Sequence, residues 1–335
     1  MTTLNSTAEG AAPGATTLPV LIRQIRYEGK GINSYELVDS EGRELPPFTS
    51  GAHIDVHLAG GNVRQYSLCN DPHDRRRYVI AILKDASGKG GSTTLHETLH
   101  VQDIITISRP RNNFELADNA RKFILLAGGI GVTPLKSMAH RLERAGVDYE
   151  LHYCAREPQS AAFKEELEAL AHNGHVYFHF DGGDPSRGLD LKSLLRQPGQ
   201  DTHVYYCGPP GFMKACADAA SHWPKGTVHF EHFKAPISAA DGAAPSVPSG
   251  SFMVVLASSG RQITVGPDES LSDALNKAGV PVETSCQSGL CATCKVRYLT
   301  GTVQHNDFIL SDEDQTEYLT SCISRATSEV LTLDL

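Results

Sequence analysis

The chain has 335 residues, of which 40% are hydrophobic and 21% are charged, and its formal net charge is −9. This length predicts two or three domains, and the composition is that of an ordinary globular protein. The acidic balance argues against nucleic acid as a main partner, and no apolar run approaches the length of a membrane-spanning helix.

Residues 1–17 are small and polar and include no aromatic residue. They lack the basic and apolar regions of a signal peptide, so we interpret them as a disordered lead. Four of the eight cysteines lie outside the C-terminal motif described below, at Cys69, Cys154, Cys207 and Cys216. Free cysteines in a chain without a signal peptide favour a reducing compartment, and we therefore expect a cytoplasmic protein.

Residues 18–119 predict a small antiparallel β-barrel, because short strands alternate with turns rich in Gly and Pro. The segment His53–Leu58 alternates polar and apolar residues, as a half-buried strand does. A hairpin turn is expected at Gly60–Asn62. Further strands are expected at Val20–Ile25, Val63–Leu68, Tyr78–Leu83 and Asp103–Ile107.

Two stretches of this barrel have features of a binding site. In the first, alternation places Arg64, Tyr66 and Leu68 on one face of a strand, and Gln65 and Ser67 on the other. In the second, Gly88–Glu97, a Gly-rich run leads through Ser and Thr into an expected helix, whose N-terminal N–H groups suit a phosphate. Each stretch alone also has an ordinary interpretation, as an edge strand or as a turn.

Residues 120–234 alternate apolar strands with helical patterns, which predicts a doubly wound parallel α/β domain. Lys122–Ala127 is expected to be a buried strand that leads into Gly128–Pro134 and a helix, the arrangement that binds a dinucleotide pyrophosphate. We expect Thr133 to cap this helix and Pro134 to be its first residue. The G-x-G-x-x-G fingerprint is only partial, so a doubly wound domain without a nucleotide stays open.

The rest of this domain predicts strands at Tyr149–Cys154, Val176–Phe180 and Thr227–Phe233, a helix at Phe163–Ala171, and a strand, turn and helix start at His203–Met213. After the second strand, Glu157 suits the ribose 2′-hydroxyl of NADH, whereas Arg156 suits the 2′-phosphate of NADPH. These two neighbours therefore indicate opposite preferences.

Residues 235–249 are rich in Pro, Ala, Ser and Gly and predict a linker. In residues 250–335, strands are expected at Phe252–Leu256 and Gln262–Val265, and a helix at Leu271–Ala278 is expected to end before Gly279.

A cysteine motif dominates this last domain. Cys286, Cys291, Cys294 and the distant Cys322 have the C-x4-C-x2-C…C spacing of a plant-type [2Fe–2S] cluster. A zinc site usually shows two C-x2-C pairs, and only one is present. A disulfide pair would suit a secreted chain. We therefore assign the four cysteines to a [2Fe–2S] cluster in a β-grasp ferredoxin domain.

Other catalytic motifs do not occur. The 15 histidines show no H-E-x-x-H or facial-triad spacing, and the chain has no G-x-S-x-G elbow or Walker loop. We assign no second metal and no hydrolytic activity.

Taken together, these motifs resemble the phthalate dioxygenase reductase family, which orders an FMN domain, an NAD domain and a plant-type ferredoxin domain in one chain. The resemblance covers residues 18–335 and implies an antiparallel flavin-binding β-barrel, a doubly wound parallel α/β NAD domain and a C-terminal β-grasp ferredoxin domain. It is carried by Arg64–Asn70, Gly88–Ser92, Gly128–Pro134, Cys207–Pro209, His229–Phe233 and the cysteine loop.

The resemblance implies FMN rather than FAD. Arg64 would pair with the flavin phosphate, Tyr66 would pack against the flavin, and Ser67 would meet the edge of the isoalloxazine ring. The backbone of Ala81–Leu83 would run along the ring. The residues implied for FMN are Arg64, Gln65, Tyr66, Ser67, Ala81, Ile82, Leu83, Gly90, Gly91 and Ser92.

The resemblance also implies the nucleotide site, with NADH favoured. Cys207 would lie beside the nicotinamide and Phe233 near the flavin, and with Ser67 they would position the rings. A buried strand-end cysteine and a core phenylalanine are the ordinary alternatives. The residues implied for NAD are Gly128, Gly129, Gly131, Val132, Thr133, Pro134, Arg156, Cys207, Gly208 and Pro209.

These assignments predict one electron pathway. NADH gives up two electrons as hydride, a [2Fe–2S] cluster accepts one at a time, and a flavin converts between the two. We predict an NADH-dependent oxidoreductase that passes electrons through FMN and the cluster to a separate partner. The resemblance implies a Rieske-type non-haem iron oxygenase acting on an aromatic acid, with no membrane or nucleic-acid partner. The alternatives are a reductase for a haem or other acceptor, and an electron carrier or redox sensor that does not oxidise NADH.

Overall fold

The structure is a computed structural model that describes residues 17–58, 63–85, 91–118, 120–234 and 250–335. The predicted lead (apart from Thr17), the turn at Gly60–Asn62 and the linker at 235–249 lie outside the described residues. The chain divides into two compact units. The first unit is Met1–Gly208 with Ala215–Phe230, and the second is Pro209–Lys214 with Glu231–Leu335.

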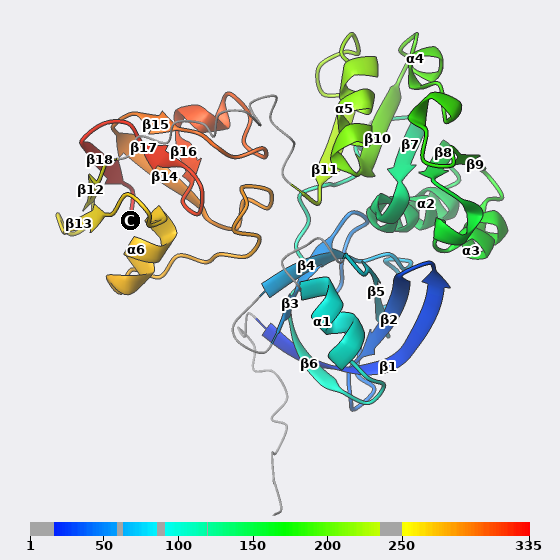
Figure 1. Cartoon of the computed structure of the whole chain (residues 1–335), viewed down its shortest axis with the longest axis horizontal. Coiled ribbons are helices and arrows are strands. Elements are labelled where there is room, and N and C mark those ends of the chain that lie inside the picture. The colour runs from blue at the N-terminus through cyan, green and yellow to red at the C-terminus, as the bar shows by residue number, and fades with distance from the viewer. Residues whose placement is uncertain (1–16, 59–62, 86–90, 119, 235–249) are drawn as a thin grey trace, which may run out of the picture. The chain divides into compact units, whose positions relative to one another are not determined.

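The N-terminal strands form an antiparallel sheet that curls into a barrel (Figure 1). Within the described residues this sheet has six strands in the order β4-β3-β6-β1-β2-β5, so β4 and β5 are its two edges. Their apolar side chains, among them Ile22, Ile54 and Ile80, fill a buried core. The elements are β1 (Thr17–Gly29), β2 (Ile32–Val38), β3 (His53–His57), β4 (Val63–Ser67), β5 (Tyr78–Leu83), α1 (Gly91–Thr98) and β6 (Ile104–Ser108).

Three features of the barrel differ from the sequence prediction. Strand β2 was not expected, and β1 is longer than predicted. The prediction that the His53–Leu58 segment is half-buried is wrong, because Asp55 on its polar face is only 5% exposed. The chain that follows β6 covers this face, where Arg111 pairs with His53 in a β-bridge and donates to the Asp55 carboxylate at 2.7 Å.

The second part of the chain is built on a sheet in the order β11-β10-β7-β8-β9, in which β10, β7, β8 and β9 are parallel neighbours. The apolar run of β7 explains its central place, since a parallel strand is covered on both faces. The elements are β7 (Lys122–Gly128), α2 (Val132–Ala145), β8 (Asp148–Ala155), α3 (Lys164–Leu170), β9 (His175–Phe180), α4 (Leu191–Leu194), β10 (Thr202–Gly208), α5 (Pro210–Ala219) and β11 (Val228–His232).

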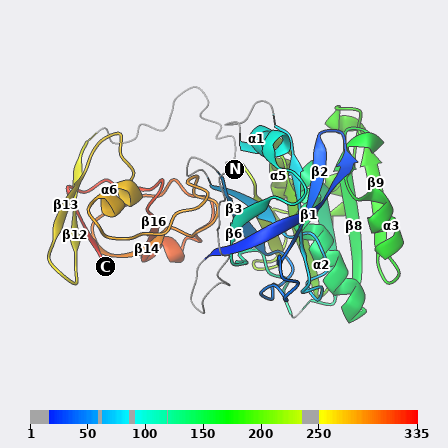
Figure 2. The same cartoon turned by 90° about the horizontal axis from the view of Figure 1, so that it is seen from below.

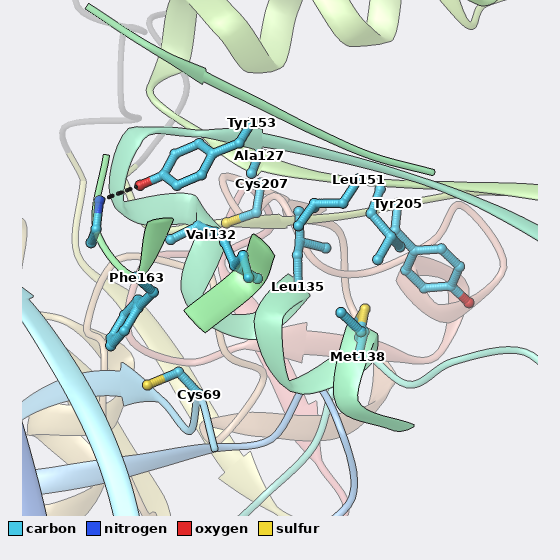
Figure 3. Packing of buried hydrophobic residues seen from close by; sticks show 14 of the residues in the cluster. Cys69, Ala127, Val132, Leu135, Met138, Leu151, Tyr153, Phe163, Tyr205 and Cys207 are labelled. Carbon is cyan, nitrogen blue, oxygen red and sulfur yellow. Dashed lines mark hydrogen bonds between the residues drawn. The ribbon is translucent and has the colours of Figure 1, made fainter. Parts of the chain in front are cut away.

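Helices α2 and α3 cover one face of this sheet (Figure 1). Val132, Leu135 and Met138 recur at helical spacing on α2 and pack on Leu151 of β8 and its neighbours (Figure 3). Tyr153 of β8 is fully buried in the same cluster, and its hydroxyl accepts a hydrogen bond from the Ala162 N–H at 3.0 Å. Among the described residues, no helix combines the length and the hydrophobicity that crossing a bilayer would require.

The C-terminal domain has a sheet in the order β13-β12-β18-β14-β16, with β12 and β18 parallel and the other pairs antiparallel (Figure 2). Helix α6 begins after Ser270, whose hydroxyl accepts from the Asp273 N–H, and its Leu271 and Leu275 enter the core. The elements are β12 (Phe252–Leu256), β13 (Gln262–Val265), α6 (Leu271–Lys277), β14 (Lys295–Thr300), β15 (Val303–Gln304), β16 (Tyr318–Thr320), β17 (Arg325–Ala326) and β18 (Val330–Leu333). Together, the three domains confirm the predicted fold class.

Tyr205 supports a testable prediction about stability. This fully buried side chain of β10 donates to the Glu115 carbonyl at 3.0 Å and accepts from the Ala117 N–H at 2.8 Å. We expect Tyr205→Phe to lower the free energy of unfolding by about 1–3 kcal/mol, because both backbone groups lose their partner. Urea unfolding followed by circular dichroism measures the change. Tyr206→Phe is the control, and equal loss in both variants would contradict this role of the Tyr205 hydroxyl.

Candidate functional site

Seven of the ten residues predicted to bind FMN come from β4 and β5, the two edges of the barrel sheet within the described residues. In the register of β4 with β3, Arg64 lies opposite Val56 and Tyr66 opposite Ile54. An edge strand has backbone N–H and C=O groups that no neighbouring strand uses. Two such edges suit the predicted contact between backbone and a flat ring.

Arg64 and the N-terminus of α1 lie against each other. A Cβ added at Gly91 would lie 2.4 Å from the Arg64 Nε, so only glycine lets the guanidinium approach the helix this closely. Both groups carry positive charge, since the first N–H groups of a helix form the positive end of its dipole. A guanidinium and a helix N-terminus held together fit an anion such as the FMN phosphate. The Ser92 hydroxyl accepts from the Asp85 N–H at 3.0 Å, and Gly90 lies outside the described residues.

Beside this anion position, the site has a mostly buried wall. The Gln65 Nε2 is buried with no hydrogen-bond partner, which suits a donor awaiting a ligand acceptor. Burial raises the pKa of Tyr66 above its ordinary value, so its hydroxyl stays protonated. The remaining predicted residues differ in exposure: Ser67 is 4% exposed, Ala81 4%, Ile82 0% and Leu83 40%.

His96 is a part of this wall that sequence reasoning missed. Its Nε2 lies 2.8 Å from the Ile82 carbonyl oxygen, and its Nδ1 lies 3.3 Å from the Asn33 amide nitrogen. Donation from Nε2 and acceptance at Nδ1 satisfy both partners. The residue thereby attaches α1 to β5, and so connects the helix start predicted to bind the phosphate to the strand predicted to line the ring. A lone histidine in an ordinary helix gives no sequence signal for this role.

The predicted nucleotide loop packs against the end of β10. Gly129–Gly131 forms a 3-10 turn that runs directly into α2, and Gly129 has a positive φ of 54°. A Cβ at Gly131 would lie 2.2 Å from the Cys207 carbonyl oxygen and 2.7 Å from the Gly208 nitrogen. The structure therefore brings together the two stretches that the sequence assigned to the dinucleotide.

The predicted helix start is wrong by two residues. Gly131 is the N-cap and Val132 begins α2, whereas the Thr133 hydroxyl donates to the Ile130 carbonyl at 3.0 Å. Gly131 already has right-handed helical backbone, with φ −63° and ψ −4°, so the helix starts before Thr133 and needs no side-chain cap there. Pro134 remains tolerated because the first turn has no use for its missing N–H.

The stretches predicted to bind FMN and NAD contact each other. Strand β5 contacts the Gly129–Gly131 turn, and Ala81 belongs to the same buried cluster as Val132 and Cys207. Arg156 follows β8 directly and is exposed.

Three further residues have predicted roles at the nucleotide or the flavin. Glu157 forms an ion pair with Lys30 at 3.0 Å. Pro209 and Phe233 belong to the second unit, and Phe233 is 38% exposed. Their roles beside the rings stay predictions.

The four cysteines of the motif lie in two close pairs, and all are thiols rather than disulfides. The Cys294 thiol donates to the Cys322 sulfur at 3.1 Å, well beyond the roughly 2.05 Å of an S–S bond. Hydrogen bonding within the first pair lowers the pKa of Cys291 to about 5 and raises that of Cys286. In the second pair, the hydrogen bond with Cys322 lowers the pKa of Cys294, and the same hydrogen bond raises the pKa of Cys322.

This pairing fits a two-iron cluster. Each iron of a [2Fe–2S] centre takes two cysteine thiolates, so two pairs are needed rather than one group of three. Within the described residues, no three His, Cys, Asp or Glu side chains converge on one metal position. Gly289 turns the loop with a φ of 69°, and the Leu290 N–H donates to the Cys286 sulfur at 3.3 Å. A backbone N–H that donates to a ligand sulfur stabilises its thiolate form.

Comparison with known protein families matches two of the three domains. Residues 254–327 match the 2Fe-2S iron-sulfur cluster binding domain, and residues 125–218 match the oxidoreductase NAD-binding domain. The first range contains all four cysteines, and the second contains Gly128–Pro134 and Cys207–Pro209.

Relatives match nearly the whole chain. The reductase subunit of tert-butanol monooxygenase/tert-amyl alcohol desaturase from Aquincola tertiaricarbonis is 52% identical, covering 96% of each chain. Phthalate dioxygenase reductase from Burkholderia cepacia is 40% identical over 91% of this chain and 94% of its own. A solved structure of phthalate dioxygenase reductase superimposes with a TM-score of 0.70 at 38% identity, covering 95% of this chain and 98% of that one.

The fold, the cysteine pairs and these matches define an NADH-dependent oxidoreductase that uses FMN and a [2Fe–2S] cluster. More particularly, the chain belongs to the phthalate dioxygenase reductase family.

Gly131 provides a test of the nucleotide loop. We expect Gly131→Ala to weaken NADH binding by about tenfold or more, since its methyl group would overlap the Cys207 backbone and displace the loop. Titration of the protein with NAD⁺ by calorimetry measures the affinity, and bound flavin and iron are expected to stay unchanged. Gly211→Ala is the matched control, because a Cβ there meets nothing within 4 Å. Unchanged affinity in Gly131→Ala would remove this turn from the site.

Proposed function

We propose that this chain is the reductase component of a Rieske-type oxygenase system whose substrate is an aromatic acid or a related compound. The observation that supports this best is the presence of two cysteine pairs in a chain that also has the flavin and NAD folds. When bound, FMN takes two electrons as hydride from NADH and releases them singly to the cluster. The residues of the chain bind and orient the carriers, and hydride transfer itself needs no general acid or base.

The barrel residues hold FMN by its two ends in this proposal. Arg64 and the N-terminus of α1 bind the phosphate, with Gly91 and Ser92 at the helix start. Tyr66 packs against the flavin, and the backbone of β5 lines the ring. The close approach of Arg64 to Gly91 supports this assignment, because two positive groups in contact are stabilised by an anion.

The nucleotide loop holds NADH beside that ring. Gly129–Gly131 and the start of α2 bind the pyrophosphate, and Cys207 and Gly208 lie where the nicotinamide enters. The contact of this turn with β5 supports a short path between the two rings. Cys207 acts by position rather than as a nucleophile, because it is fully buried.

Thiolates at the four cysteines bind the cluster, and a separate oxygenase takes its electrons. The relatives reported above are named for a tertiary alcohol and for phthalate, although both are at least 40% identical to this chain. Such different substrates indicate that the oxygenase selects the substrate and the reductase only supplies electrons.

A haem acceptor is the second candidate. One relative, 39% identical over 96% of the chain, is named the β subunit of a haem-dependent oxidative N-demethylase from Ectopseudomonas mendocina. The same chain design therefore occurs in a protein named for haem chemistry. An electron carrier that does not oxidise NADH is not retained, since the family is one of NADH-dependent oxidoreductases.

Arg64→Ala tests the flavin end of the pathway. A lost charge-assisted hydrogen bond is worth about 1.5–3 kcal/mol, so the Kd for FMN is expected to rise roughly 10- to 100-fold. Flavin retained after gel filtration, measured by absorbance, reports the change. Arg23→Ala is the control, because Arg23 is also a barrel-strand arginine, and its exposed side chain pairs with Glu36 rather than lying at α1. Full flavin retention in Arg64→Ala would exclude Arg64 from the site.

Cys291→Ser tests the proposed order of carriers and the partner together. Serine supplies no thiolate, so we expect NADH still to reduce the flavin while electron delivery to a purified Rieske oxygenase stops. Flavin absorbance is measured first, after NADH is added without oxygen. Oxygen is then admitted to the same sample, and the oxygenase product is measured. Cys154→Ser, outside the motif, is expected to keep both steps.

Two outcomes would overturn parts of this proposal. Loss of flavin reduction in folded Cys291→Ser would show that the cluster does not follow FMN. Wild-type chain that reduces a haem oxygenase but no Rieske oxygenase would favour the second candidate.

A further inference from the structure

Helix α2 is fastened to the barrel one turn after the nucleotide loop. The Lys136 Nζ donates to the Cys69 carbonyl at 3.1 Å, and the Ser137 hydroxyl donates to the Asn70 carbonyl at 3.1 Å. Cys69 and Asn70 are separated by Leu68 alone from the end of β4, the strand that carries Arg64–Ser67. Two consecutive side chains of the helix therefore hold two consecutive carbonyls that follow the flavin strand.

Both donors are buried, which is unusual for a lysine. Lys136 is 4% exposed and Ser137 is 0% exposed. The ammonium group also lies 3.0 Å from the Glu166 carboxylate and 4.7 Å from the centre of the Phe163 ring. Burying a charge is costly unless it is paired, and an apolar side chain of similar length would fill this space at lower cost. The lysine therefore contributes a directional contact: its hydrogen bond to the Cys69 carbonyl fixes where the helix meets the barrel.

The carboxylate partner extends the connection to a second strand of the barrel. Glu166 of α3 also accepts from Arg26 of β1 at 2.6 Å. Burial alone would raise the pKa of Glu166, but Lys136 and Arg26 outweigh it and lower the pKa. Glu166 thus stays ionised, and the charge on Lys136 remains paired.

The barrel side of the connection is equally fixed. The Cys69 N–H donates to the Val79 carbonyl at 2.9 Å, and the Val79 N–H donates to the Asn70 side chain at 2.9 Å. Val79 is in β5, the strand expected to line the ring, so Cys69 and Asn70 are joined to both flavin strands. Figure 3 shows Cys69 beneath Phe163, facing the buried cluster that includes Val132 and Leu135 of α2.

A polar cavity beside this connection is not the cofactor site. It has a volume of about 210 Å³ and is lined by charged groups that include Arg26, Lys136, His140 and Glu166. Ligand pockets usually measure roughly 300–1,000 Å³. Positive and negative groups are mixed around it, so the lining favours neither an anionic nor a cationic ligand.

We propose that Lys136 and Ser137 are positioning residues that set the distance between the nicotinamide and the flavin. This inference rests on the FMN and NADH positions proposed above. A helix is stiff over one turn, so a shift at residues 136–137 moves the Gly129–Gly131 turn with it. Hydride transfer requires reacting atoms about 3–3.5 Å apart, and a displacement of about 1 Å can cost on the order of 100-fold in rate.

The test compares Lys136→Met and Ser137→Ala with Lys164→Met. Lys164 is a matched control, because it also pairs with a carboxylate, Glu168, and lies over a ring, Phe178, but it is more exposed. We expect both α2 variants to lower the rate of flavin reduction at saturating NADH by about tenfold or more, with bound FMN and iron unchanged. The control is expected to keep the wild-type rate.

Three measurements separate positioning from a general loss of structure. Anaerobic stopped-flow gives the limiting rate and the apparent Kd for NADH, and we expect the rate to change more than the Kd. NADH deuterated at the nicotinamide C4 should show a larger isotope effect in the variants, because hydride transfer becomes more rate-limiting. Hydrogen exchange of the loaded protein should increase in the peptides covering 67–71 and 132–142 together.

The outcomes distinguish this inference from the proposed function. Wild-type limiting rates in both α2 variants would overturn it, even if Arg64→Ala and Gly131→Ala behave as expected. Wild-type cofactor binding in Arg64→Ala and Gly131→Ala would instead overturn the proposed sites. If Lys136→Met does not fold, Ser137→Ala decides alone, because it removes only one hydroxyl.

Discussion

The single helix α2 makes three sets of contacts at once, with the end of β10, with the central strands of its sheet and with the barrel. The arrangement of the first unit depends on all three being satisfied by one stiff helix. The start of the helix follows a turn that touches the Cys207 and Gly208 backbone. Its apolar side packs on the central strands, and its second turn is hydrogen-bonded to the barrel. A helix is too stiff to satisfy these contacts independently. Its sequence therefore combines glycine before the first turn, apolar residues at helical spacing, and two buried polar residues between them.

The electrostatics of the cofactor positions follow one principle. Groups of like charge are brought together where a ligand of opposite charge is expected. Arg64 lies against the positive end of α1, and the phosphate proposed to bind there would neutralise both. In the cysteine loop, thiols are held in pairs with one pKa lowered and the other raised. Only a cation lets both members of such a pair ionise together, and the two irons supply it.

Much of this arrangement could be predicted because its signals are local. The spacing of Cys286, Cys291 and Cys294 is fixed by the geometry of a cluster loop, and the apolar run of β7 is dictated by burial on both faces. The errors come from contacts distant in sequence. Asp55 was expected in solvent because the pattern of β3 alone cannot show that Arg111 covers it. Thr133 was expected to cap α2 from the local sequence alone. The helix begins earlier because the turn before it packs closely on β10, and the local sequence does not show that contact.

Lys136 shows most clearly why a site can escape sequence reasoning. A lysine beside a serine in an amphipathic helix is normally a solvated pair, and nothing in the residues nearby predicts otherwise. Its burial is created by the barrel, which lies more than 60 residues away in the chain. Such a residue contacts neither cofactor in the proposed arrangement, but it connects the strand that binds one to the loop that binds the other. A chain that transfers hydride between two domains needs a fixed distance between them, and buried polar contacts define a distance better than apolar ones because they have direction.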